Sequence, residues 1–280
     1  MKTLHKTAIS AAAVALLSGL ASASAFAADT PENPEDAGSP IAANVTVVSD
    51  YRYRGISQSN FKPAIQGGFD YAHESGFYIG NWNSSISWIS DAASQGGANN
   101  VSAPIEMDFY AGFKKELIGE GFASDLGVLQ YYYPTTGLPS SATNPNTTEI
   151  YAAQNYTFGP VTGFVKFSYS VTNTFGFANS SGSYYPDLTA NYDTGIWGLA
   201  VNAHVGYQKI AGQNVVTGVP TASYTDWKVG LTKDFGGGLS LAAAYIGTNA
   251  AKSGSTYAYQ SPSGKNLGGS TGIVSLTKTF

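Results

Sequence analysis

The sequence has no cysteine and only two methionines, and charged residues make up 11% of its 280 positions. The lack of cysteine excludes a small secreted domain held together by disulfides. Beyond residue 27 there is no apolar run of about 18 residues, which excludes membrane-spanning helices. Basic residues are also scarce: without Lys2 and Lys6, the formal net charge falls from −4 to −6. We therefore expect no nucleic-acid partner, because such partners require basic clusters.

The first 27 residues have the three parts of a secretory signal peptide. Lys2, His5 and Lys6 form a basic start, residues 8–20 are apolar, and Ala25-Phe26-Ala27 is a small-x-small cleavage site. The apolar part is too short to cross the ~30 Å hydrocarbon core as a membrane anchor. We therefore expect residues 1–27 to be a Sec signal peptide, cleaved after Ala27, which directs the chain into the Gram-negative envelope.

Residues 28–43 differ in composition from the rest of the chain. Three prolines alternate with four acidic residues in this stretch, and hydrophobic clusters are absent. This composition predicts a disordered acidic leader, and a periplasmic contact arm is the alternative interpretation.

From Asn44 onward, apolar and polar residues alternate with period two, and turn residues interrupt the alternation at intervals. The pattern predicts twelve strands, at residues 44–56, 64–72, 77–89, 104–115, 122–133, 148–158, 161–171, 185–193, 196–208, 223–235, 239–248 and 271–280. Short connections alternate with long ones rich in Gly, Ser, Asn and Pro. This asymmetry is typical of outer-membrane β-barrels, whereas a soluble β-sandwich has no reason to keep it. The register of the 122–133 strand is open, because Tyr131, Tyr132 and Tyr133 interrupt its alternation.

The last predicted strand ends on an aromatic residue. Gly272, Val274, Leu276 and Phe280 share one face, although Lys278 departs from the pattern. The last strand of a membrane barrel must pair with the first, so that no edge stays open in lipid. We therefore expect an all-β fold, a transmembrane antiparallel up-and-down β-barrel of about 12 strands over residues 44–280. Both termini would be periplasmic, and Phe280 would be the assembly signal for the barrel-assembly machinery.

Charged residues fall on the polar faces of the predicted strands, which in a membrane barrel surround the interior. In the first strand, Val45, Val47, Tyr51 and Tyr53 are expected to face lipid. The predicted pore-lining residues are Asp50, Arg52, Arg54, Asp70, Glu106, Asp108, Lys114, Glu149, Lys166, Asp187, His204, Asp226 and Lys228. Opposed charges across a lumen create a field that selects solutes. The alternative is that they pair with one another and brace the barrel.

One segment carries a resemblance to a known family. Residues 48–59, Val-Ser-Asp-Tyr-Arg-Tyr-Arg-Gly-Ile-Ser-Gln-Ser, resemble the opening signature of the TorF-family porins, which have long been described as proteins of unknown function. Later segments fit as well, among them Gly76-Phe77-Tyr78-Ile79-Gly80 and Tyr224-Thr225-Asp226-Trp227-Lys228. The resemblance covers nearly the whole mature chain. It implies an outer-membrane barrel assigned to diffusion, and it implies no particular substrate.

No motif for catalysis or metal binding is present. His73 and His204 are the two histidines beyond the signal peptide, and neither an HExxH nor a Gly-x-Ser-x-Gly motif occurs. We therefore expect no cofactor and no enzymatic activity. The expected function is a narrow passive diffusion channel for small hydrophilic solutes or ions, embedded in outer-membrane lipid. The alternatives are a structural or adhesive barrel with a plugged lumen and, less favoured, an outer-membrane lipid hydrolase. The solute, the ion selectivity, the open or plugged state and the oligomeric state stay open.

Overall fold

The computed structural model describes residues 40–280 except residues 99 and 214–218. The expected signal peptide and residues 28–39 of the expected leader lie outside the described residues. Twelve long strands form one closed antiparallel barrel. They are β1 (Ile41–Val48), β4 (Ala64–Ala72), β5 (Phe77–Ser85), β6 (Ile105–Glu116), β7 (Phe122–Tyr132), β8 (Thr147–Phe158), β9 (Val161–Ser170), β10 (Tyr184–Asp193), β11 (Leu199–Gln208), β12 (Tyr224–Asp234), β13 (Leu239–Thr248) and β16 (Thr271–Thr279).

The first and last strands of the chain close the barrel. β1 pairs with β16 from Asn44↔Thr279 to Val48↔Ser275, and on its other edge β1 pairs with β4. Every long strand therefore has two neighbours, so no backbone edge is left unpaired. The predicted fold class, a twelve-stranded antiparallel barrel, is confirmed.

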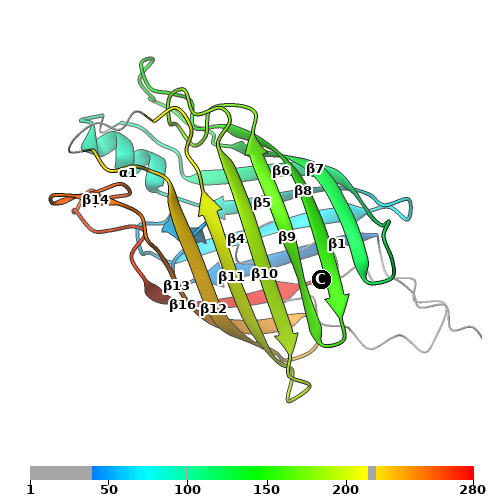
Figure 1. Ribbon diagram of the computed structural model, residues 1–280. Helices are drawn as coiled ribbons and strands as arrows, with labels where there is room; N and C mark the ends of the chain where they lie inside the picture. The colour runs from blue at the N-terminus through cyan, green and yellow to red at the C-terminus, as the bar shows by residue number, and fades with distance from the viewer. Residues whose placement is uncertain (1–39, 99, 214–218) are drawn as a thin grey trace, which may run out of the picture.

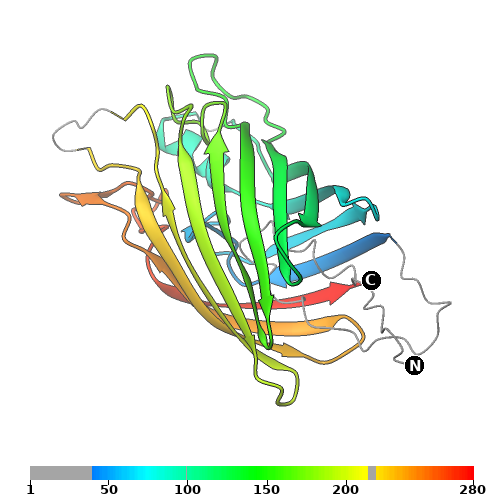
Figure 2. The ribbon, with the colours of Figure 1, turned by 45° about the vertical axis from the view of Figure 1, so that its right-hand side comes forward.

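The two ends of the barrel differ, as the alternating connection lengths predict. The long connections gather at one end, together with α1 (Trp88–Gln95) and a small hairpin of β14 (Lys252–Ser253) and β15 (Thr256–Tyr257) (Figure 1). Both ends of the described chain lie at the opposite end, where the short turns are, and Figure 2 shows β16 running to that end. No helix in the described part of the chain has the length and apolarity needed to cross a membrane.

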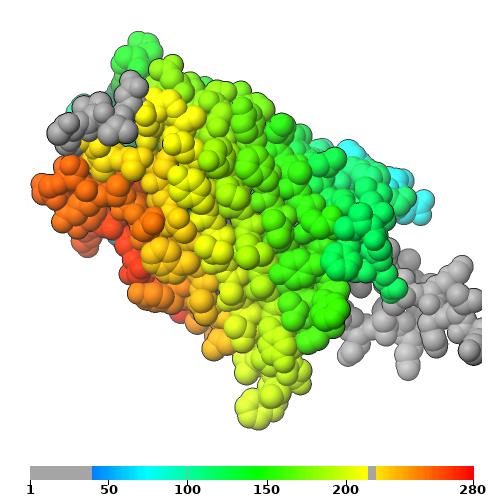
Figure 3. All heavy atoms as spheres, in the orientation of Figure 1, coloured from blue at the N-terminus to red at the C-terminus, as the bar shows by residue number. Residues whose placement is uncertain are grey.

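The outer face of the barrel is apolar, and the inner face is polar. On β9, Val165, Phe167 and Tyr169 are exposed, whereas the alternating Ser168 and Ser170 are buried. Side chains of this outer face form the continuous wall in Figure 3. The register of β7 is also settled, because Tyr132 is exposed on the outside while Tyr131 and Tyr133 are buried. This alternation is what a membrane barrel requires.

The first predicted strand is partly wrong. β1 begins at Ile41, three residues before the expected start, and ends at Val48 instead of residue 56. The chain then turns into the barrel and forms a hairpin of β2 (Arg52–Tyr53) and β3 (Ile56–Ser57). Tyr51 and Tyr53 therefore do not face lipid: Tyr51 is only 3% exposed. The strand predicted at 77–89 is also too long, since β5 ends at Ser85 and α1 follows.

Candidate functional site: a hairpin inside the barrel

Residues 49–63 form a loop, called here the inner hairpin, that crosses the interior at the long-loop end. Its two-residue turn has positive φ at both positions, 45° at Arg54 and 77° at Gly55, as a type I′ turn requires. A Cβ atom on Gly55 would lie 2.5 Å from Thr248 Cγ2 and 2.9 Å from Asp226 Cβ. The tip therefore touches β12 and β13, and glycine is needed both for its conformation and for its close approach.

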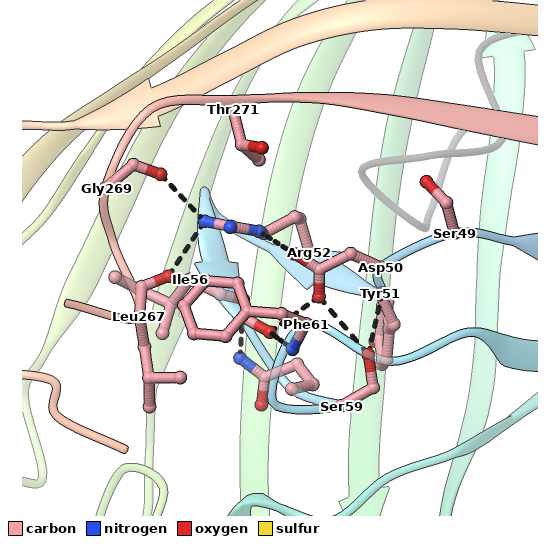
Figure 4. A network of polar contacts seen from close by, with 12 residues as sticks. Ser49, Asp50, Tyr51, Arg52, Ile56, Ser59, Phe61, Leu267, Gly269 and Thr271 are labelled. Atoms are coloured by element: carbon pink, nitrogen blue, oxygen red, sulfur yellow. Dashed lines mark hydrogen bonds and ion pairs between the residues drawn. The ribbon is translucent and has the colours of Figure 1, made fainter. Parts of the chain in front are cut away.

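Arg52 anchors the inner hairpin to the connection before β16 (Figure 4). Its Nε donates to Asp50 Oδ2 at 2.6 Å, and its Nη1 donates to the carbonyls of Gly55, Leu267 and Gly269 at 2.8–3.1 Å. Asp50 Oδ1 in turn accepts from the hydroxyl of Ser57 at 2.6 Å. The guanidinium is fully buried, so these contacts replace most of the water that Nε and Nη1 would otherwise bind, whereas Nη2 has no hydrogen-bond partner among the described residues.

Arg54 joins the tip of the inner hairpin to the far wall. Its Nη1 and Nη2 donate to Glu149 Oε1 and Oε2 on β8, at 3.0 and 2.7 Å. Nη1 also donates to Gln208 Oε1 on β11 at 2.5 Å, and the guanidinium carbon lies 4.1 Å from the centre of the Tyr185 ring. This two-pronged contact is the strongest ion-pair geometry that arginine makes.

The wall formed by β4 and β6 carries carboxylates that tyrosines bind. Glu106 accepts hydrogen bonds from Tyr51 at 2.5 Å and from Tyr133 at 2.7 Å. Burial, together with the charge of Glu106, raises the pKa of both tyrosines well above its ordinary value. Both hydroxyls therefore stay protonated and can donate. Asp70 accepts from Tyr110 in the same way, whereas Asp108 Oδ1 has no hydrogen-bond partner among the described residues.

The wall formed by β9 to β12 carries charges of both signs. His204 lies between two carboxylates, with Nδ1 2.9 Å from Asp187 and Nε2 2.8 Å from Asp226. Tyr185 also donates to Asp226, at 2.8 Å. The ammonium of Lys166 lies 4.4 Å from the centre of the Tyr151 ring. The two walls thus differ in their charges. On the β4 and β6 wall, carboxylates are bound by tyrosines, whereas on the β9 to β12 wall, cations lie among the acids.

The predicted pore-lining residues all lie inside the barrel, but they occupy two different structures. Asp50, Arg52 and Arg54 belong to the inner hairpin and not to the wall. The prediction that they project from the polar face of the first strand is therefore wrong. The other ten project inward from β4, β6 and β8 to β12; they are Asp70, Glu106, Asp108, Lys114, Glu149, Lys166, Asp187, His204, Asp226 and Lys228. That they line an open pore stays a prediction.

Two interior residues are absent from the predicted pore lining. Gln208, which alternation places on the same face as His204, binds Arg54. Asp125 accepts from Tyr78 at 2.7 Å and lies in the 122–133 strand, whose register the sequence left open. Tyr51 and Tyr53, which lie inside the barrel, could not be placed by alternation. Their positions repeat the alternation of a strand, although the chain has already left the wall.

The described residues can be compared with the geometry of a metal site and of a serine hydrolase. No group of three or more His, Cys, Asp or Glu side chains in the described residues is arranged to hold a metal ion. The hydrogen-bonding partners of the His204 ring are Asp187, Thr189, Asp226 and Tyr185. None of them is a serine, so His204 is not placed as the base of a serine hydrolase.

Two solved structures with a similar barrel are porins. The NanC porin superposes with a TM-score of 0.53 at 8% identity, over 85% of this chain and 98% of its own. The KdgM porin gives a TM-score of 0.50 at 8% identity, over 85% of this chain and 99% of its own. Outer membrane phospholipase A from Escherichia coli reaches only 0.45 at 13% identity, over 85% and 94%. The likeness to the two porins shows the barrel fold, and that to the phospholipase carries no argument.

No curated protein matches the chain in sequence. A family model does, over residues 32–280, which is most of the chain. The TorF name is not part of that match, so the narrower resemblance stays a prediction. The chain belongs to the family described as "Bacterial protein of unknown function (Gcw_chp)".

Proposed function

We propose that this chain forms a narrow diffusion channel for small hydrophilic solutes or ions in the bacterial outer membrane, with the inner hairpin as its constriction. The observation that carries the proposal is the crossing of the barrel interior by residues 49–63, whose tip is bound to the far wall. In an outer-membrane barrel the long loops face outward. The hairpin would therefore narrow the channel near its extracellular mouth. The surrounding lipid, a cleaved signal peptide and the barrel-assembly machinery belong to the same proposal.

The burial of interior charges supports a channel that narrows at one level. Around the inner hairpin, Arg54, Glu106 and Glu149 are almost completely buried. Closer to the short-turn end, Lys114, Asp125 and Lys166 are only half-buried although they also point inward. Charges that stay partly accessible inside a barrel are those that a passing solute can meet.

The same burial favours one alternative, a structural barrel with a plugged lumen. The inner hairpin also contacts the connection between β5 and β6: the amides of Ser87 and Trp88 donate to Gln58 O at 2.9 and 3.1 Å. A plugged barrel should not conduct, whereas a constricted channel should conduct weakly. The lipid-hydrolase alternative gains nothing from the geometry, since His204 points into the barrel and its ring is bound by acids.

Single-channel conductance in a planar bilayer separates these functions. The mature barrel would be compared with a variant in which residues 51–57 are replaced by a short Gly-Ser linker, and with a control in which the exposed β14–β15 turn is shortened. We expect small, steady openings in the unmodified protein and the control, and larger ones in the hairpin variant. If only the hairpin variant conducts, the chain is a plugged barrel. If none conducts although all are folded, the channel proposal is wrong.

A further inference from the structure

The long-loop end of the barrel is cationic. The long connections carry four lysines that are all exposed, Lys62, Lys209, Lys252 and Lys265. The acidic residues of these connections are Asp50 and Asp91. Asp50 is buried against Arg52, and Asp91 accepts from the Ser87 hydroxyl at 2.8 Å. The surface that a solute meets first at this end therefore carries a clear excess of positive charge.

Two of these lysines lie at the base of the inner hairpin. Lys62 follows Phe61 in the chain, and the ammonium of Lys265 lies 5.9 Å from the centre of the Phe61 ring. The Arg52 guanidinium lies over the same ring, at 5.3 Å. Positive charge thus gathers where the inner hairpin meets the connection before β16, immediately outside the constriction.

Inside the barrel, more acidic than basic side chains are buried. Asp70, Glu106, Asp108, Glu149 and Asp226 are all at most 7% exposed. Their counter-charges Arg54 and Lys228 are also buried. Between the hairpin and the short-turn rim, the half-buried charged side chains of the interior are Lys114, Asp125, Lys166, Asp187 and His204, and at the rim itself Asp193 and Asp234 are also half-buried. The accessible part of the interior is therefore less acidic than the interior as a whole.

Lys166 is the cation best placed to meet a solute below the inner hairpin. It takes part in none of the four salt bridges found in the described residues, and its ammonium lies over the Tyr151 ring. The two half-buried acids are bound by other groups, Asp125 by Tyr78 and Asp187 by His204. The contact with the ring is worth about 1 kcal/mol at a partly exposed site, so an anion can replace it at little cost. Asp187 lies opposite Lys166 in the strand register, and Asp187 and Glu149 also attract the ammonium.

We propose that the channel favours anions, with Lys62 and Lys265 attracting them at the mouth and Lys166 binding them just beyond the inner hairpin. The inference rests on the proposed channel function and adds its solute class: small solutes that carry a carboxylate, a phosphate or another anionic group. A constriction bounded by cations on both sides concentrates anions and repels cations. The rim acids Glu116, Asp193 and Asp234 lie at the short-turn end, away from the constriction, and each accepts from a turn amide.

Reversal potentials in a tenfold KCl gradient test the proposal on the full mature barrel in a planar bilayer. We expect the unmodified protein to be anion-selective. Lys166→Gln should lower the chloride-to-potassium permeability ratio about threefold or more, Lys166→Glu should lower it further, and Lys166→Arg should keep it. Lys115→Gln removes a lysine from the exterior of β6 at the short-turn end; it is the matched control and should change nothing.

The outcomes separate this inference from the function on which it rests. A barrel that conducts but prefers potassium, or a folded Lys166→Gln variant with an unchanged reversal potential, overturns the anion proposal and leaves the channel intact. A folded barrel that never conducts overturns both. Heat-modifiable migration on gels confirms that each variant is folded before its currents are compared.

Discussion

Arg54 and Glu149 form a two-pronged ion pair that links the tip of the inner hairpin to β8 across the barrel, with N–O distances of 3.0 and 2.7 Å. Ninety-five residues separate the two side chains in the sequence, and both are almost fully buried. A buried charge that loses its partner is left without water or counter-charge, which typically destabilises a protein by about 3–5 kcal/mol. The pair is therefore the contact that should hold the inner hairpin in place.

Glu149→Gln should release the inner hairpin while leaving the barrel intact. The variant leaves Arg54 buried without a counter-charge, so the hairpin should leave the interior for a larger fraction of the time. Trypsin, which cleaves after Arg52 and Arg54, detects this release directly, and we expect cleavage at least tenfold faster than in the unmodified protein.

The matched control for this prediction is Asp125→Asn. Asp125 is an interior carboxylate on β7 that binds Tyr78 and does not contact the inner hairpin. Its loss should leave the cleavage rate after Arg54 unchanged. Equal cleavage of all three proteins would show that other contacts, such as those of Arg52, hold the hairpin alone.

Gly55→Ala tests the close approach of the hairpin tip to β12 and β13. A Cβ there would lie 2.5 Å from Thr248 Cγ2, and the residue has φ +77°. Gly254→Ala is the control, because Gly254 also has positive φ, +57°, but a Cβ there would meet nothing within 4 Å. Both variants are strained by about 1 kcal/mol in the backbone, and Gly55→Ala alone adds a clash. Hydrogen exchange at residues 51–58 should therefore accelerate only in Gly55→Ala.

All twelve wall strands could be located from alternation, although the bounds of the first and third were wrong, because a barrel wall separates an apolar outside from a polar inside at every strand. β4 and β13 match their predicted bounds at both ends. The inner hairpin could not be predicted in this way. Both of its faces lie inside the protein, so Tyr51 binds Glu106 on one side while Arg52 binds backbone carbonyls on another. Period-two alternation then no longer reports which side faces lipid. Gly55 was the one local signal for a turn in this stretch.

Arg52→Gln should loosen two segments at once. Arg52 donates to the carbonyls of Leu267 and Gly269 in the connection before β16 and to Gly55 within the hairpin. Hydrogen bonds from a charged group contribute about 1.5–3 kcal/mol each, so their joint loss should exceed the effect of a surface change. Hydrogen exchange should accelerate both at residues 51–58 and at 265–270. Protection that falls in the hairpin alone would contradict the anchoring role of Arg52.

The orientation of the barrel can be tested with single cysteines in a chain that has none. Ser181 lies in a long connection and Glu120 in a short turn, and both are exposed. A membrane-impermeant maleimide added to intact cells should label Ser181→Cys and not Glu120→Cys, because long loops of outer-membrane barrels face outward. Labelling of both in lysed cells is the control for reactivity. The reverse pattern in intact cells would place the inner hairpin at the periplasmic end.

Deletion of Phe280 should impair assembly of the barrel more than it alters any current. The backbone amide of Phe280 donates to Ala43 O at 2.8 Å, so the residue extends the seam between β16 and β1 by one pair. Phe280 is 74% exposed, which means that it contributes little packing to the finished barrel and is free to be recognised before closure.

An unsealed seam between the first and last strands would leave backbone groups unpaired in lipid, at a cost of several kcal/mol each. We expect the amount of folded protein in the outer membrane to fall several-fold, while the few assembled barrels keep their conductance. Phe235→Ala removes another exposed ring at the short-turn end and should assemble normally. If the shortened chain reached the membrane at the level of the Phe235→Ala control, Phe280 would not be an assembly signal.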